Sequence, residues 1–411
     1  MAGNSHENLE DLRYEVRWNH TDEDWVASHA DDIYVALKAN LRERNLRWAI
    51  DILSMLVYPL QKVDVQDRWP KLILEILLIT HPLNTAANTQ FFKSSLWCWI
   101  GEFYLARSQR EIFDSKQIAR DAECAFLSAL CWAATDAEFI YPLMGILKIY
   151  VLREEEATTL LDWLLYYRGT QADTLLNAQI DLILAEYHVM RGEFKTANAR
   201  AEGAFGWLHR GMKSANLQNP AALACDTRYE MLRAMFIQAV AQRALHNPVE
   251  ANLHLRRMEP FLVFSNSSIH AGLTYYELGV AALYEAGDYP LAAAYFAKAE
   301  ATGTIMQYPR YRAALNYVYA LVNTQIGAFQ HAQDRLMETL GVWIYLSPQN
   351  LFIRAQLALG YNELRAGHTE DARRWRDQVY RQLELVPDSP VKATLWAETE
   401  SELGRHDEPL E

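Results

Sequence analysis

The chain is poor in glycine and proline, with 17 and 13 of them among 411 residues. Such scarcity argues against a disordered chain and against an all-β fold with many tight turns. Asn-Gly and Asp-Gly pairs are absent, as is any long alternation of apolar and polar residues, so hairpin signals are missing as well. Hydrophobic residues nevertheless make up 51% of the sequence. These observations favour a helical protein with a large core.

An excess of positive charge is also missing. Lys and Arg number 39 against 52 for Asp and Glu, which gives a formal net charge of -13. Nucleic acids and anionic membranes both reward a basic face, so we expect no direct nucleic-acid partner. The longest apolar run, 72–80, is too short to span a bilayer and contains Glu75. Because the first residues are polar and acidic, we expect a cytoplasmic protein without membrane insertion.

Cysteine is scarce, and the residue patterns of known reaction centres are absent. The four cysteines form no C-x-x-C pair and lie in apolar contexts, so we expect reduced, buried thiols: Cys98, Cys124, Cys131 and Cys225. Clustered Cys/His spacing for zinc is missing, and so is a phosphate-binding glycine loop. No Ser-His-Asp or Cys-His arrangement is recognisable. We therefore expect no catalytic residues, no metal, no cofactor and no enzymatic activity.

A glycine-to-alanine step recurs along the C-terminal half. Its members advance by 40 residues each time, as Gly287–Ala292, Gly327–Ala332 and Gly367–Ala372. Weaker copies occur earlier, at Gly192–Ala197, His246–Ala251, Leu152–Ala157 and Arg44–Ala49. A fixed period in this range indicates a solenoid of stacked units. We interpret the first position as a left-handed residue that ends one helix, and the alanine as a close contact in the next helix.

The pattern predicts an all-α solenoid of about eight antiparallel helix pairs, in which each pair packs against its neighbours. The pairs are expected near 27–57, 90–133, 139–167, 174–210, 224–260, 270–300, 309–341 and 350–384. A further helix is expected around 66–81, and a capping helix near 389–403. This gives a flexible N-terminus at 1–20, an N-terminal helical segment at 21–88, and a solenoid at 89–404 with a joint near 213–223. A flexible tail at 405–411 follows.

The residues of these helices resemble tetratricopeptide repeats, whose signature begins W-x₂-L-G-x₂-Y and continues A-x₃-F. The first half is matched by Trp97, Ile100, Gly101 and Tyr104, and the second by Ala122-x₃-Phe126. The match recurs in Tyr275, Leu278 and Gly279 with Ala292-x₃-Phe296, and in Leu359-Gly360 with Ala372. The resemblance implies a right-handed superhelix in which aromatics fill the space between repeats. We expect Trp97, Trp99, Trp132 and Trp163 to be such core residues.

The long period is similar to that of the sensor region of MalT-like transcription activators and of peptide-sensing regulators of the Rap class. The ATPase module and DNA-reading helix of those activators have no counterpart in this sequence. The resemblance therefore implies only the scaffold. Two functions stay open: an adaptor that binds another protein, and a sensor that binds a small molecule or signalling peptide.

In the family, the first helices of successive repeats line a concave groove. Carrying that register over puts nine residues on the inner face: Arg233, Arg243, Tyr276, Tyr317, Thr324, Gln325, Arg354, Tyr361 and Arg365. Arginine and tyrosine dominate many binding surfaces. Arginines in an acidic protein favour an extended acidic peptide or a carboxylate terminus as partner. Alternatively, these arginines pair with carboxylates of adjacent helices.

Overall fold

The computed structural model describes residues 12, 14–16, 19, 23–42, 46–63, 68–80, 88–112, 114–153, 155–168, 174–210, 225–262, 269–346, 349–386 and 390–403. The chain divides into two compact units: 1–109 with 114–241, and 110–113 with 242–411. The divisions fall after Gln109 and after Ala241, each inside a helix, and the predicted joint near 213–223 lies outside the described residues.

The first unit is built from helix pairs in chain order. They are α2 (Glu23–Arg42) with α3 (Leu46–Val63), α5 (Asn88–Arg110) with α6 (Ser115–Trp132), α7 (Asp136–Arg153) with α8 (Thr158–Tyr167), and α9 (Thr174–Met190) with α10 (Phe194–Arg210). An extra helix, α4 (Arg68–Thr80), follows the first pair. Each pair matches its expected range, since apolar residues recur at helical spacing throughout.

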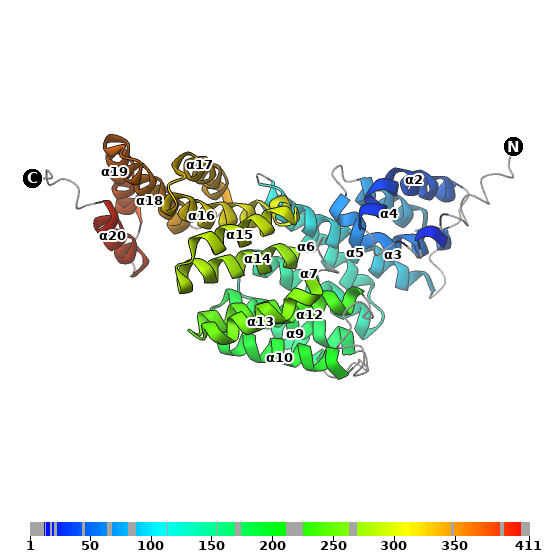
Figure 1. Ribbon diagram of the computed structural model, residues 1–411. Helices are drawn as coiled ribbons and strands as arrows, with labels where there is room; N and C mark the ends of the chain where they lie inside the picture. The colour runs from blue at the N-terminus through cyan, green and yellow to red at the C-terminus, as the bar shows by residue number, and fades with distance from the viewer. Residues whose placement is uncertain are drawn as a thin grey trace, which may run out of the picture. The chain divides into compact units, whose positions relative to one another are not determined.

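The second unit continues the same arrangement, as Figure 1 shows. Helix α12 (Cys225–Ala244), which the division crosses after Ala241, is followed by α13 (Pro248–Leu262). Then come α14 (Ile269–Ala281) with α15 (Tyr289–Ala301), α16 (Pro309–Gln325) with α17 (Phe329–Leu346), and α18 (Gln349–Arg365) with α19 (Thr369–Leu385). The expected capping helix is α20 (Pro390–Leu403), which packs on both α18 and α19. The all-helical solenoid of sequential antiparallel pairs is therefore confirmed.

The recurring step ends helices as the sequence indicates. At Gly327 the chain adopts φ 82°, its N–H donates to Thr324 O at 3.3 Å, and Ala328 N donates to Asn323 O at 2.8 Å. This pair of bonds is a Schellman motif, which needs a left-handed residue. The same two bonds close the turns at Gly192, His246 and Gly367. His246, at φ 61°, is the one non-glycine with positive φ among the residues described.

One weak copy of the step does not behave this way. Leu152 lies inside α7, which ends at Arg153, so the prediction of a left-handed residue there is wrong. A branched leucine has a steric penalty in that conformation. The chain instead leaves α7 through a bond from Glu155 N to Tyr150 O at 3.0 Å. Arg44 lies outside the described residues.

Glycines within first helices make room for buried rings. Phe126 is fully buried, and a Cβ built on Gly145 would lie 2.4 Å from its ring, while one on Gly101 would lie 2.7 Å from it. Gly279 stands in the same relation to Phe296, at 2.4 Å. The alanines of the step are buried as well, with Ala197, Ala251, Ala292 and Ala332 at 0% exposure. Close helix crossing through small residues is thus confirmed.

Several burial expectations fail. Cys124 and Cys131 are exposed, because α6 turns part of its surface to solvent, and Cys98 on α5 is half-buried. Trp132 and Trp163 are also exposed, at 37% and 47%, so the prediction that they are core residues is wrong for both. Apolar spacing alone does not reveal whether a neighbour covers a helix face.

Of the two ends predicted to be flexible, the N-terminal one lies partly within the described residues. In the stretch 1–20, the residues with described structure are helical, and Val16 is fully buried in the first core. The tail 405–411 lies outside the described range. Among the helices that are described, none combines the length and the apolar character that crossing a membrane requires.

Candidate functional site

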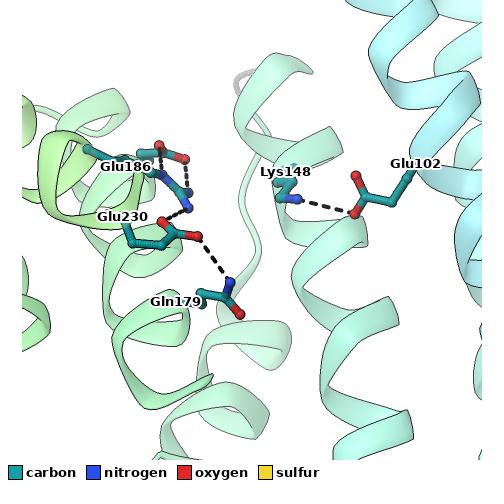
Figure 2. Close-up of polar contacts among 6 residues, drawn as sticks. Glu102, Lys148, Gln179, Glu186 and Glu230 are labelled. Atoms are coloured by element: carbon teal, nitrogen blue, oxygen red, sulfur yellow. Dashed lines mark hydrogen bonds and ion pairs between the residues drawn. The ribbon is translucent and has the colours of Figure 1, made fainter. Parts of the chain in front are cut away.

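The first helices of the first unit carry charged side chains that are paired with one another (Figure 2). Lys148 Nζ on α7 lies 3.2 Å from Glu102 Oε1 on α5. Arg233 Nε and Nη2 on α12 donate to the two carboxylate oxygens of Glu186 on α9, at 2.6 and 2.8 Å. Glu230 accepts from Arg233 Nη1 at 3.2 Å and from Gln179 at 3.1 Å.

Arg233 is held in this network by burial as well as charge. Its side chain is 10% exposed, and that of Glu230 is 7% exposed. Burial by itself lowers the pKa of the guanidinium, but Glu186 and Glu230 outweigh it and raise that pKa well above its usual value. The bidentate pair with Glu186 therefore joins two neighbouring first helices. The alternative that this arginine pairs internally is what the structure shows.

In the second unit, Arg243 is paired in the same manner. It bonds to Glu277 of α14 through both the carboxylate and, at 3.2 Å, the backbone carbonyl. Its Nε also lies 3.1 Å from Glu285, which accepts from Asn252 at 2.9 Å. The Arg243 side chain is 21% exposed.

Three tyrosines lie between Arg243 and Arg354, and we call Tyr276, Tyr284 and Tyr317 the tyrosine strip. Tyr276 lies on α14, Tyr284 in the π-helical turn after it (Ala282–Ala286), and Tyr317 on α16. Burial raises the pKa of Tyr276 to about 12, with a smaller contribution from Tyr284 and an opposing one from Arg243. Burial also raises the pKa of Tyr317, again with Tyr284 adding to the rise and Arg354 opposing it. Tyr284 thus acts electrostatically on both other tyrosines, and it is 63% exposed.

Arg354 lies at the far end of the strip. Its Nη2 donates to Glu398 of α20 at 3.0 Å, and its side chain stays 37% exposed. Burial raises the pKa of the nearby Glu402 carboxyl, the charge of Glu398 raises it further, and Arg354 lowers it. The capping helix thus supplies the carboxylate that pairs with Arg354, the earlier of the two candidate arginines on α18.

The remaining predicted residues divide into buried and accessible ones. Thr324 is 2% exposed, and its hydroxyl donates to Asn362 at 2.9 Å. Gln325 is half-buried. Arg365 is exposed and donates to Tyr361 Oη at 3.1 Å, with its guanidinium 5.9 Å from that ring. Within the described part of the chain, no carboxylate forms an ion pair with Arg365.

Sequence reasoning missed Tyr284, the most exposed ring of the strip. A signal was present, because Tyr284 follows Gly279 by five residues just as Arg365 follows Gly360 by five. Gln325 holds the corresponding place after Ala320. Counted from Gly279, Ala320 and Gly360, these three residues hold equivalent positions of successive repeats, and we call them the row. Tyr284 itself lies in the π-helical turn Ala282–Ala286, which follows α14.

The structure adds one observation on other chemistry. Among the described residues, no three or more His, Cys, Asp or Glu side chains come together as metal ligands.

No family model matches the chain, and no curated protein is similar to it in sequence. Solved structures align with it at low identity. A tetratricopeptide repeat protein from Parabacteroides merdae shares 15% identity over 73% of this chain and 98% of its own, with a TM-score of 0.40. Aspartyl phosphate phosphatase F from Bacillus subtilis shares 13% identity over 87% of this chain and 94% of its own, with a TM-score of 0.45. A Rap protein in complex with Competence and Sporulation Factor shares 13% identity over 95% of this chain and 99% of its own, with a TM-score of 0.48. With scores this low, the fold assignment rests on the helix pairs themselves.

Proposed function

We propose that this protein is a non-enzymatic scaffold that binds another protein through an extended peptide segment. The binding surface is the tyrosine strip with the row formed by Tyr284, Gln325 and Arg365. The observation that supports it is an exposed tyrosine and an exposed arginine that follow Gly279 and Gly360 by the same five residues, with Arg365 outside any described ion pair.

The chemistry of the row favours an acidic peptide. Tyrosine offers a large ring with a hydroxyl and few rotatable bonds, which makes it an efficient contact residue. Arg365 presents a planar guanidinium whose donors fit a carboxylate. Arg243 and Arg354 already have internal partners, so they contribute positive potential at the two ends more than direct contacts.

The test is capture of partners from the native host by the immobilised protein. Arg365→Glu and Tyr284→Ala are expected to weaken capture of the same partner by about tenfold or more, because bonds to a charged group contribute about 1.5–3 kcal/mol. Arg374→Glu on α19 is the matched control, since it makes the same charge change at an arginine that is 79% exposed and paired with Asp371. Equal loss in the control, or unchanged capture by both test variants, contradicts the proposal.

The second candidate function is a sensor that takes a small molecule or signalling peptide on the same surface. The half-buried ring of Tyr276 and the partly desolvated carboxyl of Glu402, whose pKa burial raises, offer surroundings that suit a small ligand. A thermal-shift screen separates the two functions, because a ligand that binds only the folded state raises its melting temperature. Stabilisation by a metabolite that Arg365→Glu abolishes favours the sensor.

A further inference from the structure

Helix α8 exposes an apolar face on the first unit. Only Leu164 among its ten residues is fully buried. The outward side carries Trp163 at 47%, Leu165 at 38% and Tyr166 at 70% exposure. We call these three residues with Asp162 the α8 face. Contiguous exposed rings of this kind mark interaction sites more often than scattered single ones.

The rings of this face are held in place from behind. Trp163 stacks on Tyr167 with centroids 6.4 Å apart and 23° between planes, and Tyr166 meets Tyr167 edge-on at 5.3 Å. Phe139 of α7 packs against Trp163 at 5.8 Å and against Tyr167 at 6.0 Å. A surface whose side chains are already fixed by packing loses little entropy when a partner binds.

The charged groups at the α8 face that lie outside described ion pairs are acidic. Asp162 is exposed on α8, and Asp136 at the start of α7 is exposed beside Tyr167, whose pKa is raised by burial and then by Asp136. No ion pair of either aspartate occurs among the described residues. The neighbouring cations are engaged elsewhere, Arg153 with Glu123 at 2.7 Å and Arg168 with Asp181 at 2.6 Å.

We propose that the α8 face is a second docking surface, for a cationic segment of a partner protein in which arginine or lysine alternates with large apolar residues. The aromatic rings of Trp163 and Tyr166 receive the cations on their faces and the apolar residues at their edges. Asp136 and Asp162 supply the complementary charge. A nucleic acid does not fit, because it would bring phosphates toward unpaired carboxylates.

This surface is independent of the proposed function. It lies in the other unit, carries the opposite charge, and needs none of the residues of the tyrosine strip. Arg365→Glu is therefore expected to leave binding at the α8 face unchanged, and a failure of one proposal does not imply a failure of the other.

The experiment uses the full chain and a fluorescein-labelled decapeptide of alternating arginine and leucine, with its glutamate–leucine counterpart, titrated by fluorescence anisotropy. Trp163→Ala with Tyr166→Ala is expected to raise the Kd of the arginine peptide about 5- to 30-fold, from two exposed cation–π contacts. Asp136→Asn with Asp162→Asn is expected to raise it several-fold, with a weaker salt dependence. Trp163→Phe with Tyr166→Phe keeps the rings and is expected to retain most of the affinity.

Asp121→Asn with Leu127→Ala on α6 is the matched control, because it removes an exposed carboxylate and a side chain that is 49% exposed in the same unit. Circular dichroism verifies that every variant stays folded. The proposal is overturned if the control weakens binding as much as the test variants, which indicates attraction to net charge alone. It is also overturned if the glutamate peptide binds equally well, or if the arginine peptide does not bind.

Discussion

The contact between Gly145 and Phe126 allows a prediction whose sign is opposite to that of helix propensity. Alanine in place of glycine within a helix ordinarily stabilises by about 1 kcal/mol. At Gly145 the new methyl would lie 2.4 Å from the Phe126 ring, well inside contact distance. The ring is fully buried and already faces Gly101, so it has no space to retreat.

Overpacking of a filled core costs typically about 1–3 kcal/mol, and this site belongs at the upper end. We therefore expect Gly145→Ala to lower the free energy of unfolding by about 2 kcal/mol after the propensity gain is included. Gly206 in α10 is the matched control, since its Cβ would meet nothing within 4 Å. Gly206→Ala is expected to raise the free energy of unfolding by about 1 kcal/mol.

Urea unfolding followed by circular dichroism measures both changes. A double-mutant cycle with Phe126→Leu adds a stringent test, because the smaller side chain frees space for the methyl group. In the Phe126→Leu background, Gly145→Ala is expected to cost much less. If Gly145→Ala stabilises as much as Gly206→Ala, or if the two changes at 126 and 145 are additive, the packing argument is refuted.

Three further predictions concern single groups. Arg233→Met is expected to lower the free energy of unfolding, measured with urea, by about 3–5 kcal/mol, because it leaves the carboxylates of Glu230 and Glu186 without their cation. Cys124 is expected to react with iodoacetamide at pH 8 much faster than Cys98, whose pKa is raised by burial, and mass spectrometry of the modified peptides gives both rates. Tyr276 has a folded pKa of about 12, above its unfolded value near 10, so its contribution to stability is complete below pH 10 and is lost as the pH rises toward 12. Tyr276→Phe should remove that part of the alkaline decline in melting temperature, and an unaltered decline would contradict the assignment.

The helix pairs could be predicted from the sequence because two local signals coincide. Apolar residues recur at helical spacing, and the glycine-alanine step sets where each hairpin turns. Both signals depend on a few neighbouring residues, as the Schellman bonds at Gly327 illustrate. The prediction failed at Leu152 for an equally local reason: Ala157 is present, but Leu152 does not adopt the left-handed conformation that ends a helix.

The partners of the candidate residues could not be predicted. Whether Arg233 meets Glu186 depends on the lateral offset between α9 and α12, and the chain pattern carries no measure of that offset. The exposure of Trp163 was missed for a related reason. Its apolar spacing is that of a core residue, and only the placement of neighbouring helices decides which side of α8 is covered.

If a ligand contacted Arg354 or Arg243 directly, it would compete with the carboxylates that already pair with them. An acidic ligand that bound Nη2 of Arg354 would displace Glu398, which would then return to water on the capping helix. The measured affinity would be the difference between two similar bonds, so weakly basic anions and buffer ions compete poorly. Because Glu398 belongs to α20 and Arg354 to α18, the released bond is also one that fixes the spacing of those helices. Ligand binding and the separation of the last two layers would thus be thermodynamically linked.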